Sequence, residues 1–211
     1  MKLYCLSGLG VDKRAFKFIE PNGINLIHIE WIEPLSHETL KEYALRLFKV
    51  VNPEDDYNLI GVSFGGMIAT EFSKIKQPKN LFLLSTIGSA NELSKLFKFG
   101  STLRLHKLIP GQILTRGNFI SNYLFGVKNA SEKKLLNQIL SDTDPNFIKW
   151  AINAIVNWEN SQKPKAIRIH GNNDKILPLR QNTDYVIEGG GHFMVISRAK
   201  EITEIIEREC V

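Results

Sequence analysis

The chain has very few cysteines. Cys5 and Cys210 stand at opposite ends of its 211 residues, and neither has a partner in a C-x-x-C arrangement. A disulfide framework, a zinc site built on cysteines and a dithiol redox centre are therefore all disfavoured. We expect no metal site and no cofactor.

Long apolar runs are also missing. No stretch approaches the roughly 18 consecutive apolar residues of a membrane-spanning helix, so no membrane span is expected. The segment Met1–Leu6 begins like a signal peptide, but no A-x-A cleavage motif follows and charge returns at Asp12, Lys13 and Arg14. We interpret it as the first core strand of a cytoplasmic protein.

Basic runs are absent although the net charge is +5. Residues 86–164 contain ten Lys/Arg and five Asp/Glu, and the rest of the chain has seventeen of each. The excess is scattered and no nucleic-acid module is recognisable, so nucleic acid is not an expected partner. These charges either keep exposed helix faces soluble or attract an acidic partner or anionic substrate. The second interpretation points to Lys95, Lys98, Arg104 and Lys107.

What the chain does contain is an ordinary globular composition, with 43% hydrophobic and 23% charged residues. Six short apolar segments predict strands at Lys2–Leu6, Ile24–Ile29, Tyr57–Val62, Leu81–Leu84, Ala166–His170 and Tyr185–Ile187. Helical patterns at Ser36–Val51, Phe64–Lys76 and Ser197–Glu209 alternate with them. This alternation predicts an α/β fold, in which helices cover both faces of a mostly parallel six-stranded sheet.

Residues 86–164 follow a different pattern, with helical periodicity, many aromatics and no convincing strand. Asp144-Pro145 is typical of a helix start. We therefore predict one domain, a core of residues 1–85 and 165–211 with a helical insertion. The aromatics of the insertion either pack its helices together or line a cap over a substrate site. The candidates for that lining are Phe97, Phe119, Phe125 and Trp150.

The motif Gly61-x-Ser63-x-Gly65 lies between a predicted strand and a predicted helix. Such a tight reversal needs neighbours without a Cβ and exposes the serine at the end of the strand. Asp174 and His192 also follow predicted strands, so all three side chains are expected at the carboxyl edge of the sheet, where ligands of parallel sheets bind. Other acids remain alternatives to Asp174, and the other histidines are interpreted as structural. The alternatives are Asp142, Asp144 and Asp184, and the other histidines are His28, His37, His106 and His170.

These motifs resemble the α/β-hydrolase superfamily over nearly the whole chain. The chain order Ser63, Asp174, His192 matches the superfamily's nucleophile, acid and histidine. His170-Gly171-Asn172-Asn173-Asp174 is similar to its H-G-x-x-D acid loop, and Gly191-His192-Phe193 to its G-H-F loop. Ser7-Gly8-Leu9-Gly10 is similar to its H-G-x-G oxyanion loop, with Ser7 in place of the usual histidine. The resemblance implies a strand order 2-1-3-4-5-6 and a helical cap at residues 86–164.

The resemblance also implies roles for these residues. Ser63 would be the nucleophile, His192 its general base, and Asp174 the group that orients His192. The backbone N–H groups of Leu9 and Phe64 would stabilise the oxyanion. Gly8 is expected beside the substrate.

The predicted function is hydrolysis of a small, partly apolar carboxylic ester through an acyl-enzyme. The same three residues also serve C–C bond hydrolysis and acyl transfer, and a hydrolase scaffold can act as a non-enzymatic receptor. A further alternative is NAD(P) binding, because Gly8-x-Gly10 with Glu30 partly imitates a dinucleotide fingerprint. Lys13 stands where that fingerprint requires glycine or alanine, which argues against it.

Overall fold

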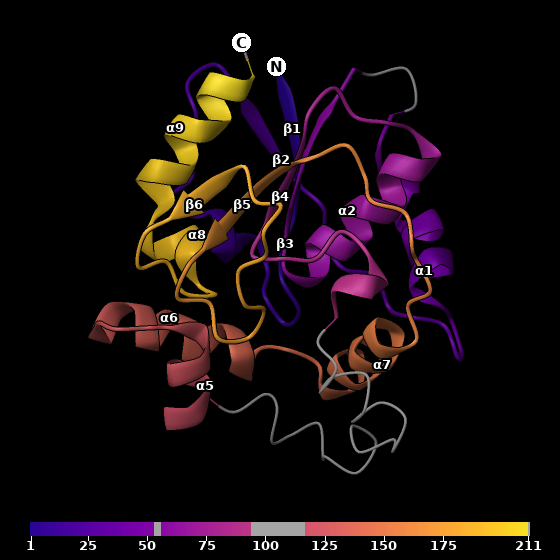
Figure 1. The fold of residues 1–211 in the computed structure, drawn as a ribbon. Coiled ribbons are helices and arrows are strands. Elements are labelled where there is room, and N and C mark those ends of the chain that lie inside the picture. The colour runs from indigo at the N-terminus through magenta and orange to yellow at the C-terminus, as the bar shows by residue number, and fades with distance from the viewer. Residues whose placement is uncertain (53–55, 94–116, 211) are drawn as a thin grey trace.

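A six-stranded sheet forms the centre of the computed structural model, which describes residues 1–52, 56–93 and 117–210 (Figure 1). Its strands are β1 (Lys2–Leu6), β2 (Asn25–His28), β3 (Asn58–Val62), β4 (Leu81–Leu84), β5 (Ile167–Gly171) and β6 (Tyr185–Ile187). Their order is β2-β1-β3-β4-β5-β6, and every neighbouring pair is parallel. The predicted fold class and strand order are confirmed.

Helices cover both faces of this sheet (Figure 1). The α-helices are α1 (Leu40–Leu47), α2 (Phe64–Ile75), α5 (Phe119–Phe125), α6 (Ala130–Ser141), α7 (Pro145–Val156), α8 (Met194–Ser197) and α9 (Ala199–Glu209). Short 3₁₀ turns are η1 (Lys13–Phe16), η2 (Phe48–Val50) and η3 (Ala90–Glu92). Helices α1 and α2 pack on one face, and α8 and α9 pack with η1 on the other.

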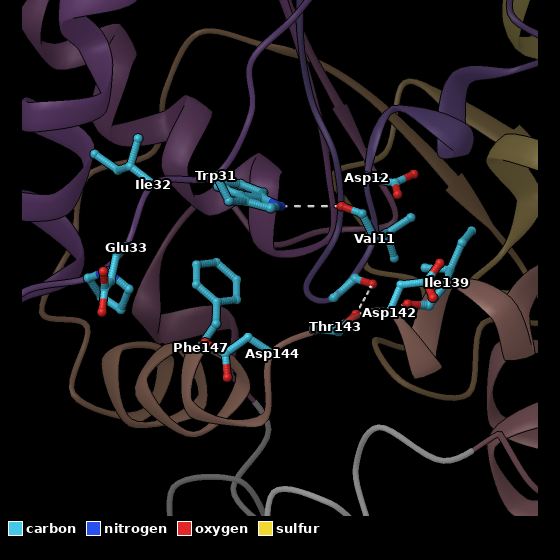
Figure 2. A pocket seen from close by; sticks show the side chains of 12 residues that line it. Val11, Asp12, Trp31, Ile32, Glu33, Ile139, Asp142, Thr143, Asp144 and Phe147 are labelled. Carbon is cyan, nitrogen blue, oxygen red and sulfur yellow. Dashed lines mark hydrogen bonds between the residues drawn. The ribbon is translucent and has the colours of Figure 1, made fainter.

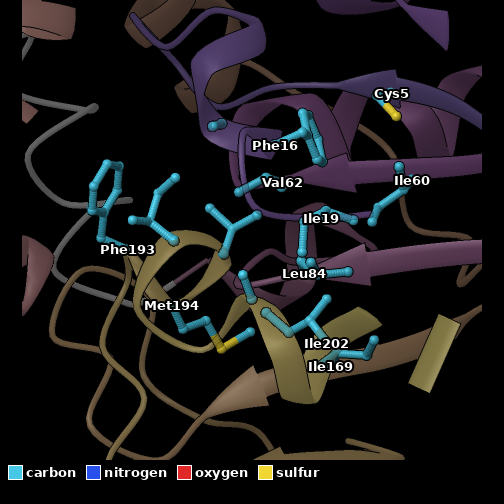
Figure 3. Packing of buried hydrophobic residues seen from close by; sticks show 14 of the residues in the cluster. Cys5, Phe16, Ile19, Ile60, Val62, Leu84, Ile169, Phe193, Met194 and Ile202 are labelled. Carbon is cyan, nitrogen blue, oxygen red and sulfur yellow. The ribbon is translucent and has the colours of Figure 1, made fainter. Parts of the chain in front are cut away.

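The strands have a core on each side because successive side chains point to opposite faces. In β1, Leu3 and Cys5 belong to the cluster under α8 and α9, whereas Tyr4 and Leu6 belong to the cluster under α1 and α2. Figure 3 shows the first cluster, in which side chains of α8 and α9 meet those of β3, β4 and β5. Because both faces are buried, all four residues Leu81–Leu84 can be apolar.

Two predicted helix boundaries are wrong. The helix expected from Ser36 begins at Leu40, because Thr39 and Glu42 form a reciprocal capping box that Ser36 cannot form. The C-terminal helix expected from Ser197 is preceded by α8, and the two helices are separated at Arg198. The buried side chains of α8 follow the His192 loop directly, so this segment is part of the core rather than a loop.

Between β4 and β5, the described residues form η3, α5, α6 and α7 and contain no strand. In Figure 1 these helices lie at the lower end of the molecule, beyond the carboxyl ends of the strands. Their assignment to a separate cap remains a prediction. Within the described ranges, no helix has the length and apolar character needed to cross a membrane.

Candidate active site

Ser63 occupies a strained turn between β3 and α2. Its backbone has φ 52° and ψ −117°, an uncommon conformation for a residue with a side chain, which costs roughly 1–3 kcal/mol. The turn is held by hydrogen bonds from Ser63 N to Leu84 O at 2.9 Å and from Thr86 Oγ1 to Ser63 O at 2.5 Å. The sharp reversal therefore places the Ser63 hydroxyl beyond the strand and next to the start of α2.

The two glycines of the motif are required by close backbone contacts. A Cβ on Gly61 would lie 2.5 Å from Gly65 O, and a Cβ on Gly65 would overlap Ser7 O. The first contact brings the strand against the helix, and the second brings the helix against the loop after β1. The spacing of the motif thus has the physical cause expected from the sequence.

His192 lies between Ser63 and Asp174. Its Nε2 is 2.9 Å from Ser63 Oγ, and its Nδ1 is 2.8 Å from Asp174 Oδ2. His192 and Asp174 are both only 5% exposed. An ionised carboxylate can only accept, so Nδ1 carries the ring proton and Nε2 is left to accept the Ser63 proton.

The carboxyl group of Asp174 is surrounded by donors. Its Oδ1 accepts hydrogen bonds from the backbone N–H groups of Ile176 and Leu177, both at 2.9 Å. Burial raises the pKa of this carboxyl, but the hydrogen bonds from His170, His192 and Leu177 lower it more. The pKa of Asp174 is therefore well below its usual range, and the group is an anion at neutral pH.

No family model and no curated protein matches this sequence, whereas solved structures match it closely in fold. An esterase from Exiguobacterium antarcticum has a TM-score of 0.75 at 13% identity, covering 100% of this chain and 92% of its own. For an esterase from Thermogutta terrifontis the TM-score is 0.72 at 18% identity, covering 99% and 88%. For a bromoperoxidase from Bacillus anthracis it is 0.68 at 15%, covering 99% and 91%. The chain has the α/β-hydrolase fold.

His170, which the sequence leads us to interpret as structural, is buried beside Asp174. His170 Nε2 is 2.6 Å from Leu177 O and 3.4 Å from Asp174 Oδ2. Both neighbours are acceptors, so Nε2 carries the proton. The sequence signal for this contact was available, because His170 precedes Asp174 by four residues in the H-G-x-x-D pattern.

The loop expected to bind the oxyanion lies directly beside Ser63. A Cβ built on Gly8 would be 3.6 Å from Ser63 Cβ. Phe64 is the first residue of α2, so its N–H has no partner within the helix. The second predicted donor, the N–H of Leu9, belongs to a turn closed by a hydrogen bond from Val11 N to Gly8 O at 3.0 Å. The role of both N–H groups as oxyanion donors remains a prediction.

The predicted substrate-lining aromatics have different surroundings. The Phe125 ring is 5.5 Å from the His192 ring, edge to face. Trp150 packs 4.4 Å from the Tyr43 ring and donates from Nε1 to Glu38 O. Phe119 is 84% exposed, and Phe97 lies outside the described residues. Among the described aromatics of this set, Phe125 is the one with a ring contact to His192.

A pocket of about 450 Å³ adjoins the loop after β1, which is expected to bind the oxyanion (Figure 2). Its walls come from the loop after β1, the loop after β2 and the turn between α6 and α7. It is lined by Gly10, Val11, Asp12, Trp31, Ile32, Glu33, Pro34, Ile139, Asp142, Thr143, Asp144 and Phe147. The rings of Trp31 and Phe147 also contact Phe64, at 5.4 and 6.3 Å. One aromatic layer therefore separates this pocket from the start of α2.

The alternative acids are engaged elsewhere. Asp142 pairs with Arg14 at 2.8 Å, Asp144 caps α7, and Asp184 accepts a hydrogen bond from the Arg168 backbone at 2.7 Å. Among the described residues, no group of three or more His, Cys, Asp or Glu side chains has an arrangement that could hold a metal ion. Asp174 is thus the acid in contact with His192.

Proposed function

We propose that this protein is a serine hydrolase that cleaves a small, partly apolar carboxylic ester through an acyl-enzyme on Ser63. The observation that carries the proposal is the pair of hydrogen bonds linking Ser63 Oγ to His192 Nε2 at 2.9 Å and His192 Nδ1 to Asp174 at 2.8 Å. The esterases and hydrolases among the structural neighbours are consistent with it.

In the first half-reaction, Ser63 Oγ attacks the ester carbonyl carbon while its proton passes to His192 Nε2. Asp174 stabilises the resulting imidazolium and keeps the ring in the required orientation. The carbonyl oxygen becomes an oxyanion, to which the N–H groups of Phe64 and Leu9 donate. When the tetrahedral intermediate collapses, the C–O bond breaks and His192 returns the proton to the leaving alcohol.

In the second half-reaction, water attacks the acyl-enzyme. His192 takes one proton of this water as the new C–O bond forms, and returns it to Ser63 Oγ as the carboxylic acid leaves. The second half-reaction repeats the proton transfers of the first, so the His192 imidazole acts as base and then as acid in both.

Substrate contacts are assigned to Gly8 beside Ser63 and to Phe125 beside His192. The further aromatics Phe97, Phe119 and Trp150 extend the proposed lining. An aromatic lining favours a partly apolar acyl group, since burying apolar surface contributes about 25 cal/mol per Å². A panel of p-nitrophenyl esters of increasing acyl length would establish the chain length preferred.

The direct test is intact-mass labelling with a fluorophosphonate. The wild-type protein should gain one phosphonyl group, and the Ser63→Ala variant should gain none. His192→Gln should label far more slowly, because the base is lost while the hydroxyl remains. Labelling that persists in Ser63→Ala would contradict the proposal.

The alternatives that share the three residues differ in substrate or acceptor. Acyl transfer would yield a new ester when an alcohol is added, whereas hydrolysis yields only the acid. A C–C hydrolase would cleave a β-diketone with a rate exceeding that for any ester. A receptor would bind ligand without reacting with the phosphonate, and NAD(P) binding would give a signal in a nicotinamide titration.

A further inference from the structure

The loop Gly8–Val11 accepts hydrogen bonds from side chains outside it. Gly10 adopts φ +71°, a left-handed conformation that glycine enters and leaves at little cost. Ser7 stands at the start of the loop, where the α/β-hydrolase resemblance leads one to expect a histidine. The conformation of this loop therefore depends on bonds that other segments make to it.

Two of these bonds fix the end of the loop. Val11 O accepts a hydrogen bond from the buried Ser7 hydroxyl, and a second from Trp31 Nε1 at 3.2 Å. Both donors belong to the core, in the loops after β1 and β2. They hold the carbonyl of Val11 but leave that of Gly10 to another partner.

The partner of Gly10 comes from the insertion. Thr143, in the turn between α6 and α7, has its Oγ1 2.6 Å from Gly10 O and 2.9 Å from Ile139 O. The hydroxyl has a single proton, and Gly10 O is the nearer of the two acceptors. Among the described residues, Thr143 is the donor to the buried Gly10 carbonyl, and Figure 2 shows it beneath the loop. A neighbouring ion pair, Arg14–Asp142 at 2.8 Å, docks the same turn.

We propose that Thr143 is a positioning residue, whose hydroxyl holds the Gly10 carbonyl and thereby fixes the Leu9 N–H towards the oxyanion; this inference rests on the proposed serine-hydrolase function. Without the hydroxyl, a buried carbonyl loses its partner. The peptide after Gly10 then turns towards water, and glycine does not resist that rotation. The turn that carries the Leu9 N–H opens as a result.

The test compares four proteins: wild type, Thr143→Val, Thr143→Ser and Ser141→Ala. The valine keeps the size of threonine without the hydroxyl, and the serine restores the hydroxyl. Ser141 is the matched control, since its hydroxyl bonds only within α6, to Gln138 O at 2.8 Å. Each is assayed for kcat and KM on one p-nitrophenyl ester, and for the Ki of an alkylboronic acid that forms a tetrahedral adduct on serine.

Thr143→Val should lower kcat about 10- to 100-fold, less than or near the loss of a whole oxyanion donor. KM should stay within about twofold and the boronic acid Ki should rise in parallel with the loss of kcat, because both report stabilisation of the tetrahedral state. Thr143→Ser should recover most of the rate, and Ser141→Ala should match wild type.

The inference is overturned if Thr143→Val retains the wild-type kcat, or if Thr143→Ser is as slow as Thr143→Val, since then the methyl group matters and not the hydroxyl. Should Thr143→Val fail to fold, Thr143→Ala compared with Thr143→Ser gives the same decision. Wild-type protein that neither hydrolyses esters nor labels with the phosphonate would overturn the proposed function together with this inference.

Discussion

The sheet core and the helical insertion hold their functional groups in different ways. In the core, Ser63, Asp174 and His192 are carried by loops that follow β3, β5 and β6, and the parallel pairing of the sheet fixes where those loops emerge. The acid and histidine loops are also bonded to each other, through Asn173 N and Gly190 O at 2.9 Å. Many backbone bonds would have to break before these side chains separated.

The insertion is attached to the core by apolar packing, by a backbone hydrogen bond from Phe193 N to Phe125 O, and by hydrogen bonds of individual side chains. The bonds from Thr143 to Gly10, from Trp150 to Glu38 and from Trp158 to Glu71 each join one residue of the insertion to one of the core. Such bonds are removed one at a time by substitution. Changes at the core edge should therefore abolish activity, whereas changes in the insertion should have graded effects.

Ser63→Ala should have the largest effect. Loss of the nucleophile is expected to lower kcat by about 10⁴ to 10⁶, with the fold retained because the backbone of the turn is held by Leu84 and Thr86. Ester hydrolysis and thermal unfolding, measured on the same preparation, separate these two statements. A variant with near wild-type turnover would place the nucleophile elsewhere.

Asp174→Asn is expected to lower kcat by about 10⁴, because a neutral amide cannot stabilise the imidazolium and favours the wrong tautomer. Since the pKa of Asp174 lies well below its usual range, this group is expected to be ionised at neutral pH. Only neutral imidazole can accept the proton, so kcat/KM of the wild type should rise with pH in a single step. A second ascending step at acidic pH would show that the carboxyl titrates in the working range.

Asp184→Asn is the matched control for that variant, because Asp184, which lies directly before β6, also accepts a backbone hydrogen bond. It should retain the wild-type rate within about threefold. If Asp184→Asn were slow and Asp174→Asn fast, the assignment of the acid would be wrong.

The difference between the two regions also explains what the sequence could predict. The α/β class and the approach of Ser63, Asp174 and His192 follow from apolar segments and the loops after them, which are local signals. The strand order was implied by the resemblance to the α/β-hydrolase superfamily. The exact start of a helix depends on which of several nearby residues forms the N-cap. At α1 this residue is Thr39, whose capping box with Glu42 determines where the helix starts.

The contacts of the loop Gly8–Val11, which is proposed to bind the oxyanion, had no such signal in the sequence. Thr143 is 133 positions from Gly10 and Trp31 is twenty from Val11. Neither lies in a recognisable motif, and only the packed structure brings them together. His170 lies between these cases, because the H-G-x-x-D pattern places it near Asp174 but does not by itself show that the two side chains are in contact.

Trp158→Phe tests the insertion's attachment with a smaller expected effect. The Trp158 indole donates to the buried Glu71 carboxylate at 2.7 Å. When the indole is removed, Lys74 at 2.6 Å is the side-chain partner left to Glu71 among the described residues. Leaving a buried acceptor under-satisfied should lower the free energy of unfolding by about 1–3 kcal/mol. Chemical denaturation measures this, and kcat should change less than about twofold.

Trp150→Phe is the corresponding change at a more exposed tryptophan, where the lost bond is to an uncharged backbone acceptor, Glu38 O, at 2.9 Å. It should destabilise the protein less than Trp158→Phe. An equal or larger loss would show that ring packing, rather than the buried carboxylate, determines how the insertion is held.

The smallest effect expected concerns charge. All the excess positive charge lies in residues 86–164. Five lysines of this segment are exposed: Lys128, Lys133, Lys134, Lys149 and Lys163. The four residues Lys95, Lys98, Arg104 and Lys107 lie outside the described residues. If the electrostatic field of these charges steers an anionic substrate or an acidic partner, it acts on the association rate. Salt screens this field beyond about 8 Å at physiological ionic strength.

An anionic ester should therefore lose kcat/KM several-fold between low and high salt, while a neutral ester of equal acyl length should not. Changing Lys95, Lys98, Arg104 and Lys107 to glutamine should abolish that difference, whereas the same change at the exposed core lysines Lys17, Lys41, Lys49 and Lys200 should preserve it. The pocket beside Gly10 and Val11 is lined by four carboxylates, of which Asp12 and Asp142 pair with Arg14, so this pocket is not expected to attract an anion. Equal salt dependence for both esters would leave the basic insertion as a solubility feature.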